Sequence, residues 1–135
     1  MIIIGLVSAA TLGACASTDA ASSTEEPITV EEVAGTGFSR LTLSVSAADR
    51  LDIQTATVEP ASNGMVVPSA AVIIDTAGVY WVYTNPEPLV YIREEIRPVH
   101  EEGGEAFFNV GPPTGMAVVT VGVPELYGAE FGIGK

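Results

Sequence analysis

The chain has 135 residues, and 17 acidic against 5 basic residues give it a formal net charge of −12. This charge excludes a role in nucleic-acid binding, which needs basic surface. It would also repel anionic lipid head groups, so any attachment to a membrane would depend on acyl chains. The length suffices for one small domain, and the single cysteine, Cys15, excludes both a disulfide within the chain and a thiolate metal site.

The first 14 residues are uncharged and rich in Ile, Leu, Val and Ala. They are too few for a membrane-spanning helix, which needs about 20 residues, and a short apolar run that ends in small residues is typical of a secretory signal. Residues 12–15 (Leu-Gly-Ala-Cys) resemble the lipobox of bacterial lipoproteins, although no Lys or Arg precedes the apolar run. The resemblance implies that residues 1–14 are a lipoprotein signal peptide and that Cys15 carries lipid such as palmitate on the extracytoplasmic face of the cell membrane. The alternative is an inert, buried Cys15.

Small polar residues, glycines and the acid pairs Glu25-Glu26 and Glu31-Glu32 dominate residues 15–37. Such a composition buries too little apolar surface to offset chain entropy. It predicts a flexible, lipid-anchored linker over residues 15–37 and a folded domain over residues 38–135.

The folded domain alternates short β-rich runs with turn residues. Phe38–Val45 alternates apolar and polar residues, as expected for a strand with one buried face, and Ser46 could cap one helical turn after it. The runs that predict strands are 38–45, 53–58, 72–74, 79–83, 89–99, 105–110 and 116–121, with turns or loops at 60–64, 85–88, 101–104 and 111–115. About seven short strands with almost no helix predict an all-β fold, either a small antiparallel barrel or a sandwich.

A hairpin at the centre of this pattern is the predicted core. Val72–Ile74 and Val79–Tyr83 flank the tetrad Asp75–Gly78, whose residues suit a four-residue loop built on a type I turn. The hairpin holds Trp81, the only tryptophan. Its aromatic residues Tyr80, Trp81 and Tyr83 could pack in the core or form an exposed stacking platform.

The sequence contains no catalytic constellation. His100 is the sole histidine, and no Gly-x-Ser-x-Gly elbow, phosphate loop or dinucleotide fingerprint is present, so we expect neither an enzyme nor a bound cofactor. Imidazole and carboxylates can bind a divalent metal, which makes His100, Glu101 and Glu102 candidate ligands, with further acids nearby at Glu94, Glu95 and Glu105. The alternative is a solvated acidic loop.

Three pieces of the chain resemble parts of the periplasmic adaptor proteins of efflux pumps, also called membrane-fusion proteins. They are similar to the adaptor lead-in segment (Leu41–Leu43 and Ala48–Val58), to the strands after its coiled-coil and lipoyl parts (Val67–Val72 and Gly78–Tyr83), and to its closing turn and strand (Gly111–Gly115 and Val118–Thr120). Asp52 stands where the family usually has glycine. Only eight residues separate Val58 from Val67, where a full adaptor inserts its helical hairpin and lipoyl-like halves.

The resemblance therefore implies the β-barrel and membrane-proximal part of an adaptor, without the hairpin that reaches the outer-membrane channel. It implies a non-catalytic, lipid-anchored interaction module that docks on a transporter component or another envelope protein. The other function class is a lipoprotein that binds a metal or a small ligand. A crosslinked partner would favour the first class, and a metal-dependent thermal shift that is lost in His100→Ala would favour the second.

Overall fold

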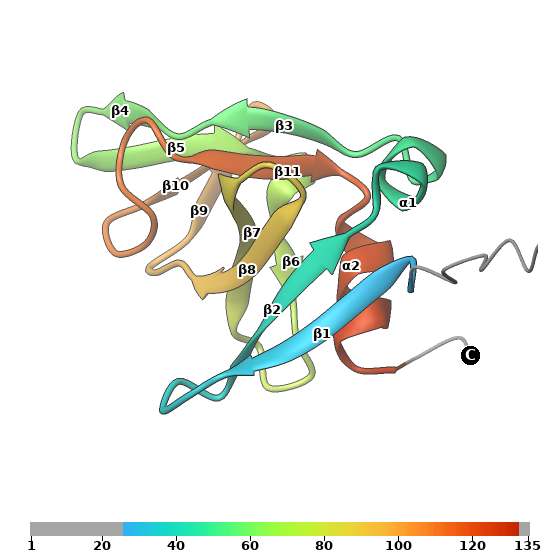
Figure 1. Cartoon of the computed structure of the whole chain (residues 1–135). Coiled ribbons are helices and arrows are strands. Elements are labelled where there is room, and N and C mark those ends of the chain that lie inside the picture. Colours follow the sequence, from blue (N-terminus) through green and yellow to red (C-terminus); the bar gives the residue numbers. More distant parts are fainter. Residues whose placement is uncertain (1–25, 133–135) are drawn as a thin grey trace, which may run out of the picture.

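Two antiparallel β-sheets form most of the structure, a computed structural model that describes residues 26–132 (Figure 1). In spatial order the larger sheet contains β1 (Ile28–Val33), β2 (Phe38–Leu43), β8 (Val90–Glu95), β7 (Tyr80–Glu87), β11 (Ala117–Val121) and β3 (Gln54–Thr57), with β6 (Ile73–Ile74) paired to β7. The smaller sheet contains β4 (Glu59–Ala61), β5 (Gly64–Pro68), β10 (Glu105–Phe108) and β9 (His100–Glu102). The predicted all-β antiparallel fold is confirmed.

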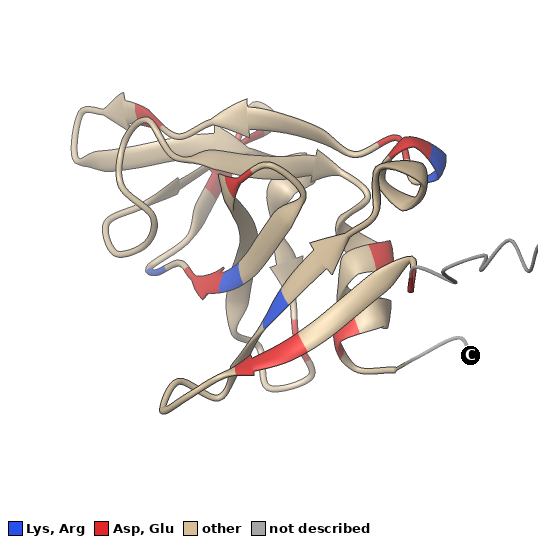
Figure 2. Cartoon of the chain, in the orientation of Figure 1, with Lys and Arg blue, Asp and Glu red and all other residues tan. Residues whose placement is uncertain are grey.

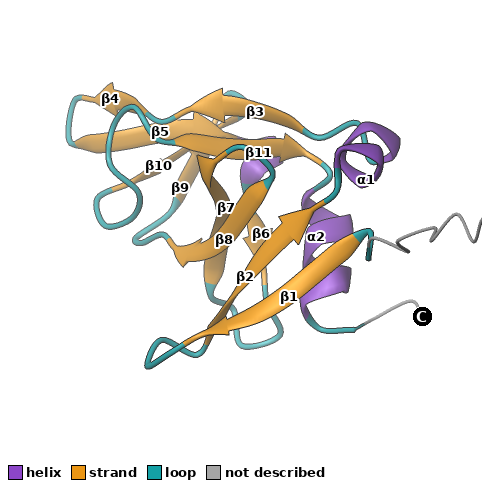
Figure 3. Ribbon diagram, in the orientation of Figure 1, coloured by secondary structure: helices purple, strands orange, loops and turns teal. Residues whose placement is uncertain are grey.

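Helical structure is short and lies beside the larger sheet (Figure 3). It consists of α1 (Val45–Arg50), α2 (Val123–Glu130) and a single 3-10 turn, η1 (Ser69–Ala71). Within residues 26–132, no helix is long and apolar enough to cross a membrane.

The larger sheet contributes to two separate hydrophobic cores because successive side chains of a strand point to opposite faces. Val82 and Val118 pack with Phe108 of the smaller sheet. The residues that follow them, Tyr83 and Val119, pack on the other face with Leu126 of α2. The molecule therefore has three layers, with the larger sheet between the smaller sheet and the helices.

The central hairpin forms as predicted. Ile73 pairs with Trp81 and Ile74 with Tyr80, and the Gly78 N–H donates to the Asp75 carbonyl at 3.0 Å, which closes the turn. The Asp75 carboxylate accepts hydrogen bonds from the Ala77 and Val79 N–H groups and, at 2.9 Å, from the Trp81 indole. The indole N–H and these backbone N–H groups lower the pKa of Asp75. Trp81 is 8% exposed and Tyr83 is fully buried, so both belong to the core.

The predicted linker over residues 15–37 is wrong from Ile28 onward. Ile28–Val33 forms strand β1, which pairs residue by residue with Phe38–Leu43. β-branched residues suit this strand, and Ile28 packs against the core under the helices. Residues 1–25 lie outside the described part of the chain, and with them the predicted signal peptide and Cys15.

Two further predictions need local correction. The cap of α1 is Ser44, whose hydroxyl accepts from the Ala47 N–H, and not Ser46. β7 runs through the proline-containing residues 85–87, where a break was expected, because an irregularity in its pairing with β8 after Thr84 accommodates them.

Helix α2 was not among the predicted elements. Pro124 in its first turn and the acidic Glu125 are typical of a helix start, but Gly128 inside the helix disfavours helical structure. The residue before the helix, Gly122, has φ +97°, a conformation that strains any residue with a side chain, and a Cβ there would meet the end of the Ile53 side chain. Glycine is therefore favoured at this junction.

A buried ion pair attaches α2 to the larger sheet. Arg93 of β8 donates from Nε to the carboxylate of Glu130 at 3.1 Å, and the two side chains are 8% and 3% exposed. The Tyr83 hydroxyl donates to the same carboxylate at 2.6 Å. Burial and this hydrogen bond to Glu130 raise the pKa of Tyr83, which keeps the phenol protonated as a donor.

Aromatic rings surround the guanidinium of Arg93. Its Cζ lies 4.2 Å from the ring centroid of Trp81, 4.9 Å from that of Phe131 and 5.5 Å from that of Phe38. These distances are within the range of cation–π attraction. We call Arg93, Glu130 and Tyr83 with these three rings the arginine cluster; it joins β2, β7, β8 and the end of α2.

Removing one partner of the ion pair should strongly destabilise the fold. We expect Glu130→Ala to lower the free energy of unfolding by about 3–5 kcal/mol, because it leaves a buried guanidinium without its carboxylate. The exposed Glu125 on the same helix is the matched control, and Glu125→Ala should lower stability by no more than about 1 kcal/mol, the contribution of an acid in the first turn of a helix. Urea denaturation measures both. Equal losses in the two variants would contradict the structural role of the pair.

The lowered pKa of Asp75 predicts a specific pH dependence. The ionised carboxylate adds stability that is fully present above the unfolded pKa of about 3.8 and is lost as the pH falls through the lower folded value. Asp75→Asn should therefore unfold more easily than the wild type at pH 7, and the gap between them should narrow below pH of about 3.8. Denaturant titrations from pH 7 to pH 2 measure this gap. A gap independent of pH would contradict the prediction.

Candidate functional site

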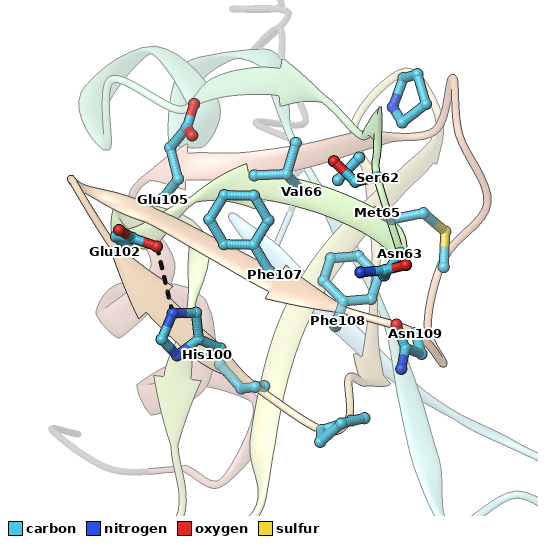
Figure 4. A pocket seen from close by; sticks show the side chains of 14 residues that line it. Ser62, Asn63, Met65, Val66, His100, Glu102, Glu105, Phe107, Phe108 and Asn109 are labelled. Carbon is cyan, nitrogen blue, oxygen red and sulfur yellow. Dashed lines mark hydrogen bonds and ion pairs between the residues drawn. The ribbon is translucent and has the colours of Figure 1, made fainter.

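The outer face of the smaller sheet carries an open groove of about 610 Å³ (Figure 4). One side comes from the β4–β5 hairpin and the other from β9, β10 and the residues beside them. The lining includes Ser62, Val66, His100, Glu102, Glu105, Phe107 and Asn109. The groove lies on the face of the smaller sheet that points away from the larger one, and in Figure 1 the β4–β5 hairpin and the helices lie at opposite ends of the molecule.

The floor of the groove is apolar. Val66 and Phe107 pair directly across β5 and β10, and Figure 4 shows them at the centre of the hollow. Their chain neighbours Val67 and Ala106 are also a direct pair and are buried in the core between the sheets. Side-chain alternation therefore puts Val66 and Phe107 on the outer face.

The rim of the groove is polar and acidic. His100 lies beside the floor, with its ring centroid 6.3 Å from that of Phe107. In the next cross-strand row, Glu105 of β10 pairs directly with Glu102 of β9. Both glutamates line the groove, and neither an arginine nor a lysine is among its lining residues. The charge on this rim is therefore negative.

A second hollow of about 220 Å³ adjoins the groove towards β3. It shares Val66 and Glu105 with the groove and adds Glu59 of β4 and Thr57 of β3. Glu59 pairs directly with Val66. The two adjoining hollows are thus lined by three carboxylates, those of Glu102, Glu105 and Glu59.

Gly64 shapes one wall of the groove. Its φ is +144°, and a Cβ at this position would collide with the Phe108 carbonyl and the Asn109 side chain. The absence of a side chain at Gly64 therefore allows Asn109 to lie against the β4–β5 hairpin at the end of the groove.

The structure separates the predicted metal-ligand candidates. His100 Nε2 lies 3.4 Å from the Glu102 carboxylate, and the two side chains are 73% and 78% exposed. Glu101 pairs with the core residue Ala106, so its side chain leaves the opposite face of β9. Within residues 26–132, no three His, Cys, Asp or Glu side chains are grouped closely enough to share a metal ion.

The other acids of that sequence cluster also diverge. Glu94 pairs with the core residue Val82, which puts its side chain on the inner side of the larger sheet, where burial raises its pKa. Glu95 lies 3.7 Å from Arg97 at the surface. Only Glu102 and Glu105 share the groove with His100.

The predicted stacking platform is wrong, and the core alternative is confirmed. Trp81 and Tyr83 are buried on one side of β7, and Tyr80 packs against the other core. The three rings therefore cannot share one exposed surface.

Sequence reasoning missed the groove because it interpreted residues 60–64 as a loop. The pair Ala61–Gly64 instead closes a hairpin with the two-residue turn Ser62-Asn63. Asn63-Gly64 was an available hairpin signal, although the structure has the two-residue turn one position earlier, at Ser62-Asn63. The pairing of β10 with both β5 and β9, which assembles the floor and rim, has no comparable local signal.

No protein-family model, curated protein or solved structure matches this chain. The function is therefore inferred from the residues of the chain and from their arrangement.

The tight contact at Gly64 gives a test of the groove wall. We expect Gly64→Ala to lower the free energy of unfolding by well over 1 kcal/mol, because a methyl group there adds a collision to an unfavourable φ. Gly103 is the matched control: its φ is also positive, at +60°, but no atom lies within 4 Å of a Cβ there. Gly103→Ala should therefore cost only about 1 kcal/mol. Equal losses in urea denaturation would contradict the wall contact.

Proposed function

We propose that this protein is a non-catalytic interaction module, held by lipid on Cys15 at the extracytoplasmic face of the cell membrane, where it docks on a transporter component. The observation that carries this proposal is the uncovered groove, whose apolar floor and polar rim match the anatomy of a protein-binding surface. A polar rim around an apolar floor excludes water from contacts made at the floor.

The adaptor resemblance supports the proposal through the arrangement of its three pieces. They contain β3, the first half of β7 (Tyr80–Tyr83) and most of β11, and in the larger sheet β7, β11 and β3 are consecutive neighbours. Segments that are far apart in the sequence thus form one continuous part of the structure. The proposed relationship is to the membrane-proximal part of an adaptor.

The groove chemistry favours binding over catalysis. His100 and the hydroxyl-bearing Ser62 both line the groove, but in the described part of the chain the only side-chain polar contact of His100 is with Glu102. A nucleophilic serine needs a hydrogen bond to its base. Amides, carboxylates and one imidazole around an apolar floor suit recognition.

The start of β1 at Ile28 limits how far the domain can lie from a lipid on Cys15. Residues 16–27 connect the two, and even fully extended they span at most about 45 Å. Confinement of both partners to one membrane raises their effective concentration, to the millimolar range for short linkers. A modest interface is then sufficient for docking.

The anchor is tested by Cys15→Ala in the complete chain. We expect the variant to leave the membrane fraction and to remain unprocessed, because the modified thiol is absent. Ser17→Ala, two residues away, should fractionate and process as the wild type does. A Cys15→Ala protein that is still cleaved and still membrane-bound would refute lipid anchoring.

Docking is tested by photo-crosslinking in the native envelope. A photoreactive residue placed at the exposed Ser46 of α1 or at Ser62 of the groove should capture a transporter component, identified by mass spectrometry. The yield should fall at least about tenfold in Cys15→Ala, because that variant lacks membrane confinement. Capture of no transporter component from either position would overturn the proposed function.

A further inference from the structure

We infer that the groove on the smaller sheet binds an extended segment of a protein partner that carries an arginine or lysine, with the cationic head beside Glu102 and Glu105 and the aliphatic stem on Phe107 and Val66. This inference rests on the proposed docking function and names the chemistry of the segment that is bound.

Glu102 and Glu105 are a directly opposed cross-strand pair. Like charges in this position destabilise a sheet. Among the described residues, the ion pairs of this sheet include only His100 with Glu102, and no arginine lies within 4.0 Å of either carboxylate. A cation from outside the chain would relieve this repulsion and form charge-assisted hydrogen bonds.

The surface beside these carboxylates is apolar. Phe107 is half-buried in the same groove, next to Val66. Arginine and lysine carry long apolar stems that pack on such surfaces while the charged head stays near water. An aromatic face also attracts the cation itself. An apolar floor beside paired carboxylates thus complements both halves of one basic side chain.

The width of the smaller sheet suits a short extended segment. The sheet has four strands, and spacings of about 4.8 Å between neighbours make it about 14 Å wide. An extended chain rises about 3.3 Å per residue, so about four or five residues cross the sheet. The second hollow adjoins the groove at Val66 and Glu105, which line both. Together the two hollows suit a short peptide segment.

Charge distinguishes this occupant from the alternatives. The chain carries −12, and Figure 2 shows acidic residues on both sheets and both helices. A second copy of the chain would bring another acidic surface to the groove, and an anionic membrane would be repelled as well. A basic segment of another protein is attracted and oriented by the same field.

Binding is tested with the full-length chain and a fluorescent hexapeptide, acetyl-Leu-Arg-Val-Arg-Leu-Gly-amide. A second peptide carries citrulline at both arginine positions, which keeps the shape and removes the charge. We expect at least tenfold weaker binding of the citrulline peptide, and weaker binding of the arginine peptide as salt increases. Equal affinities for the two peptides would overturn the inference, and so would full competition by an equal concentration of free spermine.

Matched variants locate the site. Glu102→Gln/Glu105→Gln should weaken arginine-peptide binding at least tenfold, and Phe107→Ala should weaken both peptides. Glu31→Gln/Glu125→Gln removes the same total charge from exposed positions on β1 and α2, and it should change binding less than twofold. Thermal melts confirm that each variant is folded. Equal losses in the two double variants would show a general charge effect and would overturn the groove as the site.

Photo-crosslinking separates this inference from the function on which it rests. Capture of the transporter component from Ser62 in the groove, with an arginine or lysine of that partner at the crosslink, would support both. Capture from Ser46 alone would leave the docking function standing and overturn the groove as its site. Capture from neither position would overturn the function itself.

Discussion

The ion pair between Arg93 and Glu130 fixes the C-terminal helix on the larger sheet. Burying the charge of a guanidinium that is only 8% exposed costs free energy unless a carboxylate lies beside it. Glu130 supplies the carboxylate from the end of α2, and the rings of Trp81, Phe38 and Phe131 cover the guanidinium. The helix is therefore held in one position by a directional contact, which apolar packing through Leu126 alone would not impose.

The larger sheet carries this contact on one face and the support of the groove on the other. Tyr83 donates to Glu130 within the helix-side core, and the preceding residue, Val82, packs in the core beneath the smaller sheet. Because the interior is close-packed, the groove has a rigid base. Its outer residues can then serve binding without holding the fold together.

Local chemistry accounts for the features that the sequence could predict. The hairpin around Asp75–Gly78 follows from one aspartate, one glycine and two β-prone runs, all within 12 residues. The antiparallel, mostly β fold follows from repeated short runs between turns. A short strand such as β1 was hidden by the acid pair Glu31-Glu32, because the composition of the segment resembles a linker while its backbone pairs with β2.

Features that depend on distant residues could not be predicted. Nothing near Arg93 in the sequence indicates that Glu130 supplies the carboxylate of its ion pair. Helix α2, which carries Glu130, was not predicted because it contains Gly128. The groove likewise needs β5 and β9 on either side of β10. Of the predicted site residues, His100 and Glu102 lie in the groove, Glu101 faces away from it, and Cys15 precedes the described residues.

Trp81 is the only tryptophan in the chain. Its indole N–H donates to the Asp75 carboxylate at 2.9 Å, and its ring lies against the guanidinium of Arg93. The tryptophan fluorescence of the protein therefore originates at the junction of the β6–β7 hairpin, β8 and the end of α2. Its emission reports the docking of the C-terminal helix without any added label.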